Sequence, residues 1–427
     1  MPDSLRIWIV NPFDPLPGDP EQEGRYATLA HLLVSRGHSV TWWTSEFSHR
    51  FKRPVDQVAI TAACREGNIV PRFLEAPPYY RNIGLARLRS YNVTARAFRI
   101  AANATDEKPD VILVSNPPPV LAMEAVEFAR RRGAKSIVDV QDLWPEAFIL
   151  LVPRILRPLF APAIWALRKN VRRAAIGCDS IIGVADEYVN NFLRETSDQK
   201  ITATIPLGVD LAAIEAAADV GRCDEYTKPA DEVWLAYTGS LTRSYDFQTI
   251  LRTAGRVRDK LGPRVRFFLT GRGELTTEAE RLVRELGLSN VTLTGFIPFE
   301  TWAYLLTQCD VGFNTSFPEA MVFLPNKVFF YLAAGVAVLN SIPDQCSQIL
   351  RDGGCGLDYE TGNVDSCTDA VMRVVQDDEL RESMRRAAKR LAETEYDRAV
   401  LFPRFAALIE QVAGIQTSSV SKAEAGA

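Results

Sequence analysis

The 427-residue sequence is poor in the side chains that bind metals and build disulfide frameworks. It has only three histidines, all within the first fifty residues, and seven scattered cysteines without a CxxC pair. Because neither residue type has the spacing of zinc ligands or of a disulfide framework, we expect reduced thiols, no metal site and no cofactor. Acid–base chemistry would then depend mainly on carboxylates, backbone groups or the substrate itself.

Long apolar runs and a strong charge bias are also absent. No run approaches the roughly 18 to 20 apolar residues that cross a bilayer, and the first residues lack the basic region and cleavage site of a signal peptide. The 49 Lys and Arg and 53 Asp and Glu residues give a formal charge of −4, which provides no overall attraction to nucleic acid. We therefore expect a cytoplasmic protein that binds no nucleic acid.

Short runs rich in Val and Ile alternate with helix-length amphipathic segments, and this rhythm occurs twice. In the first half it predicts strands at 5–10, 38–44, 111–114 and 136–140, with helices at 24–36 and 120–132. After residue 230 it predicts strands at 233–237, 265–270, 291–294, 311–314 and 337–340, with helices at 247–261 and 278–285. Such alternation is typical of parallel, doubly wound α/β sheets, so we expect two Rossmann-like domains.

The composition also suggests where these domains begin and end. We expect a first domain at 1–208, a polar, Ala-rich linker at 209–231 and a second domain at 232–396. A last helix at about 397–412 would pack back onto the first domain. Residues 414–427 are small and polar, and are predicted to form a disordered tail.

Two stretches of the first half contain basic residues and no acid. Residues 76–105 hold five arginines, and residues 147–178 hold six basic residues together with Trp165 and several Leu, Ile and Phe residues. Basic and apolar side chains together suit a surface that contacts anionic lipid headgroups. The same pattern also fits ordinary helices that bury their apolar faces and solvate their arginines.

Several loops at predicted strand ends have the composition of ligand-binding loops, and open α/β sheets bind ligands at the carboxyl ends of their strands. In the second half, Gly239, Ser240 and Arg243 follow one strand, and Gly271-Arg272-Gly273 follows the next. Glycines that allow close backbone approach, with nearby donors, suit a diphosphate. Such turns also arise for steric reasons alone. Neither a GxxxxGK[ST] P-loop nor a GxGxxG fingerprint after the first strand is present.

Three sequence segments carry a family resemblance: 116–118 (NPP), 136–146 (SIVDVQDLWPE) and 325–335 (PNKVFFYLAAG). In this order and spacing the chain resembles family 4 glycosyltransferases of the GT-B fold. It is most similar to the bacterial branch that builds O-antigen, capsule and exopolysaccharide, and the resemblance spans nearly the whole chain. It implies two doubly wound Rossmann-like domains facing across a cleft, with hinge closure completing the site.

The implied activity is a retaining, metal-independent sugar transfer. A nucleotide sugar would bind to the second domain, and a glycan acceptor, linked to a polyprenyl diphosphate, would bind to the first domain. The implied setting is the synthesis of bacterial surface polysaccharide. The two basic stretches would then hold the enzyme peripherally on the inner face of the cell membrane.

The resemblance also implies roles for individual residues. Lys327 matches a family cation that binds the donor diphosphate, and Arg243, Arg272, Gly239 and Ser240 are candidates for the same ligand by their position in the glycine loops. Gln141 stands where many relatives have a histidine against the transferred sugar. Asp142 would orient the acceptor hydroxyl or take its proton, or else cap the helix that follows it. The remaining acceptor-binding candidates are Gly24, Arg25, Asn116 and Trp144.

One position departs from the family pattern. The family commonly has a glutamate that binds the ribose hydroxyls, but this chain has Phe330, which cannot accept those hydrogen bonds. Glu319, Asn326 and Phe330 are our candidates for contacts with the donor sugar and ribose. The departure favours one alternative, a noncatalytic GT-B partner or regulatory protein. Two further alternatives stay open: a transferase that acts on a soluble small molecule, and a GT-B enzyme of other chemistry such as a nucleotide-sugar 2-epimerase.

Overall fold

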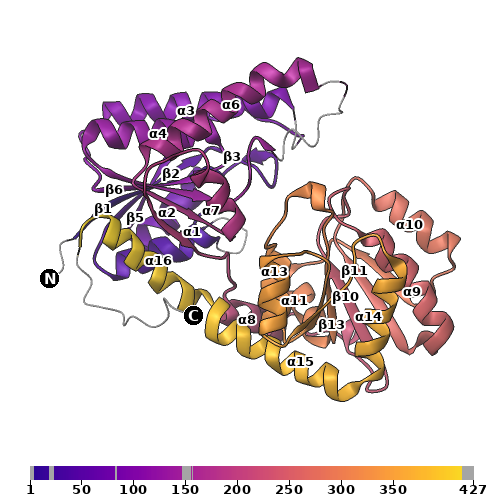
Figure 1. Ribbon diagram of the computed structural model, residues 1–427. Coiled ribbons are helices and arrows are strands. Elements are labelled where there is room, and N and C mark those ends of the chain that lie inside the picture. The colour runs from indigo at the N-terminus through magenta and orange to yellow at the C-terminus, as the bar shows by residue number, and fades with distance from the viewer. Residues whose placement is uncertain (1–3, 19–23, 82–83, 147–154, 156, 416–427) are drawn as a thin grey trace. The chain divides into compact units, whose positions relative to one another are not determined.

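The computed structural model describes residues 4–18, 24–81, 84–146, 155 and 157–415. The chain forms two compact units. One contains the residues up to Pro206 and those from Phe402 onward, and the other contains Leu207–Leu401 (Figure 1).

The first unit is built on a seven-stranded parallel sheet in the order β5-β2-β1-β6-β7-β8-β9. The central strands are buried, and the register pairs Ile7 with both Val40 and Val111. Strands covered on both faces need apolar residues at every position, which explains the continuous Val and Ile runs. The strands are β1 (Arg6–Val10), β2 (Ser39–Ser45), β5 (Ile69–Leu74), β6 (Val111–Asn116), β7 (Lys135–Val140), β8 (Ser180–Gly183) and β9 (Ile201–Thr204).

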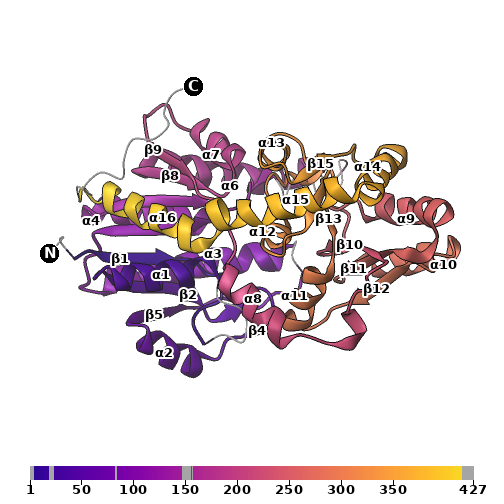
Figure 2. The ribbon, with the colours of Figure 1, turned by 90° about the horizontal axis from the view of Figure 1, so that it is seen from below.

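Helices cover both faces of this sheet. The long helices α3 (Leu85–Ala104), α4 (Pro119–Arg132) and α6 (Arg157–Gly177) lie side by side on one face (Figures 1 and 2). Helices α1 (Arg25–Ser35) and α2 (Gln57–Glu66) lie on the other face. Helix α7 (Asp186–Leu193) connects β8 to β9, and a short hairpin, β3 (Phe47–Ser48) with β4 (Arg53–Pro54), follows β2.

The C-terminal helix α16 (Arg398–Val412) returns to the first unit from Phe402 onward. Glu410 on this helix accepts hydrogen bonds from Arg36 at 3.0 Å and lies 3.1 Å from Nε2 of His38. The other ring nitrogen of His38 accepts the backbone N–H of Leu5 at 3.2 Å. His38 is therefore held in place by structural contacts at both of its ring nitrogens.

The second unit has a six-stranded parallel sheet in the order β12-β11-β10-β13-β14-β15. Its strands are β10 (Val233–Thr238), β11 (Val265–Thr270), β12 (Val291–Gly295), β13 (Val311–Asn314), β14 (Ala337–Asn340) and β15 (Gly356–Asp358). Among its helices, α9 packs against α14, α8 against α11, and α12 against α15. The helices are α8 (Leu211–Val220), α9 (Phe247–Leu261), α10 (Thr276–Glu285), α11 (Phe299–Gln308), α12 (Asn326–Ala333), α13 (Gln345–Asp352), α14 (Val364–Gln376) and α15 (Asp378–Leu391).

The stretch 209–231, predicted as a linker, is mostly ordered structure that belongs to the second unit. Asp210 caps α8 by accepting the N–H of Ala213 at 2.9 Å, and the helix buries Ile214. A Cβ at Gly221 would lie 2.0 Å from the carbonyl oxygen of Glu300, so the end of α8 touches the backbone of α11. The stretch is therefore in part a helix packed within the second unit.

The prediction of two parallel Rossmann-like halves is confirmed. None of the described helices is both long and apolar enough to span a membrane. All seven cysteines are free, and no cluster of potential metal ligands occurs within the described ranges. Almost all of the predicted tail, 414–427, lies outside them.

Candidate functional site

In the second unit, a lysine is buried where α12 begins. The side chain of Lys327 is 7% exposed, and its ammonium has no hydrogen-bond partner among the residues described. The ammonium lies 4.4 Å from the ring centre of Tyr237 and 3.9 Å from that of Tyr245, so cation–π attraction offsets part of its desolvation. Burial lowers the pKa of Lys327 to about 7. A buried cation without a hydrogen-bond partner is typical of a site that receives an anion.

The start of α12 adds a second element that attracts anions. Pro325 precedes the helix in an extended conformation, and no side chain caps the first turn. Val328 donates its N–H to the carbonyl of Pro325 at 3.2 Å, which leaves the N–H groups of Asn326 and Lys327 at the start of the helix for a ligand. The helix dipole also places partial positive charge beside Lys327.

Two glycine loops pack directly on each other beside this lysine. A Cβ at Gly239 would lie 3.2 Å from Nζ of Lys327. A Cβ at Gly271 would fall 2.1 Å from the carbonyl oxygen of Gly239, and one at Gly273 would fall 2.2 Å from that of Leu241. Gly239 and Gly271 also have φ values of 142° and 129°, which L-residues rarely adopt. Only glycine permits this backbone contact, so the structure brings both predicted loops and Lys327 together.

The other diphosphate candidates lie on the outside of these loops. Arg243 is 84% exposed, and its Nε is 3.7 Å from the carboxylate of Glu274, a surface pair of little strength. Arg272 is also exposed, and its Nε would lie 3.1 Å from a Cβ at Gly295. Ser240 is exposed as well. All three are exposed, and none of them is buried as Lys327 is.

Phe330, at the position of the expected ribose-binding carboxylate, belongs to an aromatic cluster. Its half-buried ring packs edge-on against Trp302, with centroids 5.0 Å apart and planes at 90°. The indole N–H of Trp302 donates to Oγ1 of Thr238 at 2.8 Å, directly before Gly239. An apolar wall thus stands next to the glycine loop where a carboxylate was expected.

The last two donor-side candidates, Glu319 and Asn326, are both exposed. Glu319 lies in a loop that follows β13, and that loop is tied to the first glycine loop because Phe317 donates its N–H to the carbonyl of Ser244 at 2.9 Å. The loop is therefore adjacent to the diphosphate candidates. Asn326 is the first residue of α12, directly before Lys327.

In the first unit, a fully buried carboxylate organises the end of β7. Asp139 accepts a hydrogen bond from the hydroxyl of Tyr26 at 2.6 Å and from the amide of Gln141 at 3.3 Å, and it lies 3.3 Å from Nε of Arg25. Gln141 also donates to the hydroxyl of Tyr26 at 3.1 Å. Burial and the charge of Asp139 raise the pKa of Tyr26 well above its usual value. This network fixes the side chain of Gln141.

Arg25 was predicted to bind the acceptor, but its contacts are structural. Its guanidinium is buried and donates to the carbonyls of Ile205 at 2.6 Å and Pro206 at 3.1 Å. It also lies 4.8 Å from the ring centre of Phe405 on α16. The side chain therefore joins α1, β7 and α16, and we assign it no contact with substrate. Gly24 precedes it as the N-cap of α1.

Asp142, the predicted catalytic carboxylate, follows β7 and is half-buried. Burial raises its pKa, an effect opposed by hydrogen bonds from Leu143 and Trp144 and by the charge of Arg87. The amide of Asn116, at the end of β6, lies 3.5 Å from the backbone carbonyl of Asp142. These two candidates therefore meet at one edge of the sheet. The helix that Asp142 was alternatively expected to cap lies largely outside the described residues.

Beside Asp142 lies a cluster that the sequence did not reveal. The guanidinium of Arg87 is 4.8 Å from the ring centre of Trp144 and 5.2 Å from that of Tyr91. His49 and Lys52, from the loop of the β3–β4 hairpin, lie close by over Tyr79. These residues come from separate loops and from α3, so no spacing in the sequence connects them.

Comparisons with known families agree with this geometry. Residues 24–208 match the model of a glycosyl transferase 4-like domain, and residues 224–391 match that of glycosyl transferases group 1. The protein is a glycosyltransferase of the GT-B fold. Comparison with curated protein sequences found no significant match.

Solved structures show how widely the fold of this glycosyltransferase is shared. Sucrose-phosphate synthase from Thermosynechococcus elongatus is 15% identical, with a TM-score of 0.70, over 96% of this chain and 100% of that one. A trehalose-phosphate synthase from Burkholderia vietnamiensis is 14% identical, with a TM-score of 0.70, over 97% and 98%. HepE from Anabaena, in complex with UDP and glucose, is 14% identical, with a TM-score of 0.66, over 95% and 100%. These identities establish the fold alone.

Proposed function

We propose that this glycosyltransferase moves a sugar, with retention and without a metal, from a nucleotide sugar to a glycan linked to a polyprenyl diphosphate during synthesis of a bacterial surface polysaccharide. The observation that carries the donor side of this proposal is the buried ammonium of Lys327 beside two glycine loops. The resemblance of segments 136–146 and 325–335 to the O-antigen branch supports the acceptor class and the stereochemistry.

In the proposed reaction, the bond between the anomeric carbon and the diphosphate breaks while a bond from that carbon to the acceptor oxygen forms. Negative charge then develops on the departing diphosphate. Lys327 and the first N–H groups of α12 would stabilise that charge, because fixed donors in a dry site need little reorganisation. The UDP and glucose bound to HepE support a nucleotide diphosphate as the ligand class.

On the acceptor side, we assign Asp142 the role of taking the proton of the attacking hydroxyl, with the leaving phosphate as the final proton acceptor. A carboxylate whose pKa is raised by burial is better suited to accept a proton near neutral pH than an ordinary aspartate. Gln141, held by Tyr26 and Asp139, would contact the transferred sugar.

The surface formed by α3, α4 and α6 supports attachment to a membrane. Its exposed apolar side chains include Leu159 and Trp165, which are 76% and 65% exposed. The three arginines that end α4 lie between the two predicted basic helices. Arg99, Arg168 and Arg173 pair with acids of the same unit, which reduces but does not cancel the positive charge. Apolar side chains within a cationic surface fit anionic lipid. Residues 147–154 of the second basic stretch lie outside the described residues.

The donor assignment is tested by thermal shift and calorimetry with UDP, GDP, dTDP and CMP. We expect one nucleotide to stabilise the wild type and to lose that effect in Lys327→Ala. Lys260→Ala, at an exposed lysine on α9, is the matched control and should respond like the wild type. Absence of a shift with all four nucleotides would overturn the proposal in favour of a noncatalytic protein.

The membrane assignment is tested by co-sedimentation with vesicles that contain phosphatidylglycerol, with phosphatidylcholine vesicles for comparison. We expect binding to the anionic vesicles only, and weaker binding by Trp165→Ser. Val58→Ser, at a residue of α2 that is 82% exposed, provides the control. If the protein remains in the supernatant with both vesicle types, the acceptor is instead a soluble molecule.

A further inference from the structure

Basic side chains of the first unit converge on one tyrosine at the carboxyl edge of its sheet. Nδ1 of His49 lies 2.6 Å from the hydroxyl of Tyr79, and Nζ of Lys52 lies 3.2 Å from the same nitrogen. The ammonium of Lys52 is also 4.7 Å from the centre of the Tyr79 ring. Arg87 reaches the cluster from α3, and its charge acts on the hydroxyls of both Tyr79 and Tyr91.

The charges of Arg87 and Lys52 disfavour protonation of His49, and the charge of Arg87 disfavours protonation of Lys52. Burial, then Arg87, then Lys52 lower the pKa of His49 to about 3, and burial and Arg87 lower the pKa of Lys52 to about 8. Tyr79, Phe13 and Arg87 are the other groups that face His49. An anion placed among them would relieve the repulsion and raise both pKa values.

The backbone at Lys52 gives an independent indication of function. Lys52 has a φ of 55°, in the left-handed region that glycine and asparagine adopt with less strain. It ends the loop of the β3–β4 hairpin, and its N–H donates to the carbonyl of Ser48 at 3.0 Å. Strained positions of this kind concentrate at binding sites. A lysine at this position is therefore best explained by a need for its ammonium group.

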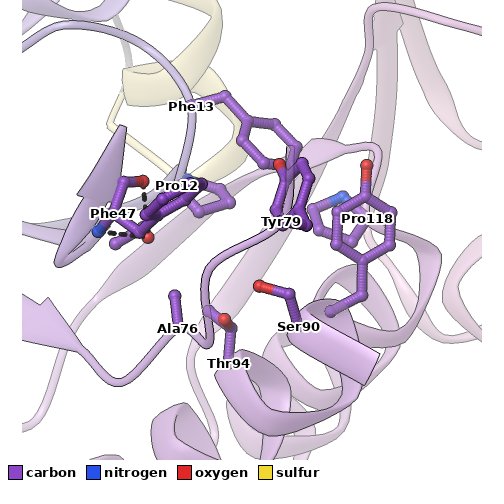
Figure 3. Close-up of a pocket in the computed structure, with 10 residues that line it drawn as sticks. Pro12, Phe13, Phe47, Ala76, Tyr79, Ser90, Thr94 and Pro118 are labelled. Atoms are coloured by element: carbon purple, nitrogen blue, oxygen red, sulfur yellow. Dashed lines mark hydrogen bonds between the residues drawn. The ribbon is translucent and has the colours of Figure 1, made fainter. Parts of the chain in front are cut away.

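A small pocket opens beside the cluster (Figure 3). The rings of Phe13, Tyr79 and Pro118 lie on one side of it, and the side chains of Ser90 and Thr94 lie on the other. These residues belong to loops after β1, β5 and β6 and to α3, which is where open α/β sheets bind ligands. The pocket has room for about one water molecule, so it is a small recess lined in part by Tyr79 and Tyr91 of the cluster and not a site for a whole sugar.

We propose that Lys52, Arg87, His49 and the hydroxyl of Tyr79 form a binding site for a phosphate group carried by the acceptor. The inference rests on the proposed transferase function and adds the residues that would bind the phosphate of the acceptor. A guanidinium and an ammonium match phosphate oxygens, and the surrounding rings of Phe13, Tyr91 and Trp144 exclude water and strengthen the attraction. A sugar phosphate in solution and an isoprenyl diphosphate in a membrane share this chemistry.

The three histidines make a direct test possible, because all of them lie in the first unit and the second unit contains none. Protein labelled with ¹³C in its histidine rings is titrated with pyrophosphate, glucose 6-phosphate and citronellyl diphosphate, with NMR detection. We expect the His49 signal to shift and its pKa to rise, while the signals of His31 and His38 stay unchanged. Tighter binding of glucose 6-phosphate would identify a soluble sugar phosphate as the source of the phosphate, and tighter binding of citronellyl diphosphate would identify an isoprenyl diphosphate.

Two variants separate binding from folding. Lys52→Asn retains a residue that tolerates the left-handed conformation, so it should fold at least as stably as the wild type and bind pyrophosphate at least about tenfold more weakly. Lys108→Ala, at an exposed lysine of the same unit, should bind like the wild type. No response of His49 at about 10 mM of any probe, tenfold above the 1 mM scale of a weak site, would overturn the inference. An equal response in Lys52→Asn would do so too.

The nucleotide measurements keep the two proposals distinguishable. If a nucleotide stabilises the protein through Lys327 and His49 stays silent, only the phosphate site is wrong. If His49 responds and no nucleotide binds, the phosphate site stands without the transferase function.

Discussion

Replacing Lys327 by methionine should stabilise the unliganded protein and weaken its binding of nucleotide. The pKa of this lysine falls from 10.5 to about 7 because its ammonium is buried. Between these values the unfolded chain binds a proton that the folded chain does not, so stability rises with pH from about 7 to 10.5. At pH 7 the mismatch costs on the order of 4 kcal/mol, from which cation–π attraction to Tyr237 and Tyr245 subtracts. Lys327→Met removes this cost and keeps the volume.

The same lysine determines how nucleotide binding depends on pH. A diphosphate beside Lys327 raises its pKa, so binding is accompanied by proton uptake. Affinity is then fully present below pH 7 and falls by up to about tenfold per unit as the pH rises above 7, until the pH reaches the pKa of the complex. The terminal phosphate of a nucleoside diphosphate, with a pKa near 6, is already ionised in this range and adds little to the slope.

Calorimetry at pH 7, 8 and 9 measures this slope, and repeating it in buffers of different ionisation enthalpy counts the protons. The nucleotide selected by the thermal-shift screen is the ligand, and thermal melting of the unliganded proteins gives the stability comparison. Arg243→Met, which removes an exposed cation that follows Gly239 in the first glycine loop, should retain the slope. A dissociation constant that does not change from pH 7 to 9, or an equal slope in Lys327→Met, would refute the reasoning.

Further consequences concern packing and chemistry. Gly271→Ala should destabilise the protein by at least about 3 kcal/mol, because the new Cβ would meet backbone at 2.1 Å. Gly262→Ala, at a φ of 73° with open space around it, should cost only about 1 kcal/mol in the same urea titration. Asp139→Ala should lower the free energy of unfolding by about 3 to 5 kcal/mol, because it leaves the buried guanidinium of Arg25 without its carboxylate. A loss of less than about 1 kcal/mol would contradict that role. Asp142→Asn should lower kcat by about 10² to 10⁴ and leave nucleotide affinity within twofold. An unchanged kcat would remove Asp142 from the chemistry.

Much of the architecture was predictable because strands buried on both faces require uninterrupted apolar runs. Strands such as 265–270 were assigned from such a run to within a residue. Strand β9 (Ile201–Thr204) was missed because it is an edge strand that exposes part of its surface and contains two threonines. The structure places a helix within the stretch 209–231 that the sequence suggested as a linker. Only Leu211, Ile214 and Ala218 of this helix are buried, which gives a weak apolar pattern in the sequence.

The candidate site of the second unit could be read from the sequence because its main parts are short contiguous motifs. Gly239, Gly271 and Lys327 each follow or begin a regular element, and parallel strands bring their carboxyl ends to one edge. The sequence could not show that Lys327 is buried without a hydrogen-bond partner, because this depends on how Tyr237 and Tyr245 cover it. The sequence also could not show that the guanidinium of Arg25 is buried and hydrogen-bonded to the backbone carbonyls of Ile205 and Pro206.

One arrangement of side chains occurs in both units. Each holds a lysine over a tyrosine ring at the carboxyl edge of a parallel sheet, with Lys327 over Tyr237 and Lys52 over Tyr79. In both, burial lowers the pKa of the lysine, to about 7 and about 8. An anion beside either lysine raises its pKa and so favours its protonated form. The gain in charge is larger at Lys327, whose pKa of about 7 leaves it only partly protonated at neutral pH without a ligand. Anion binding is therefore coupled to proton uptake more strongly in the second unit than in the first.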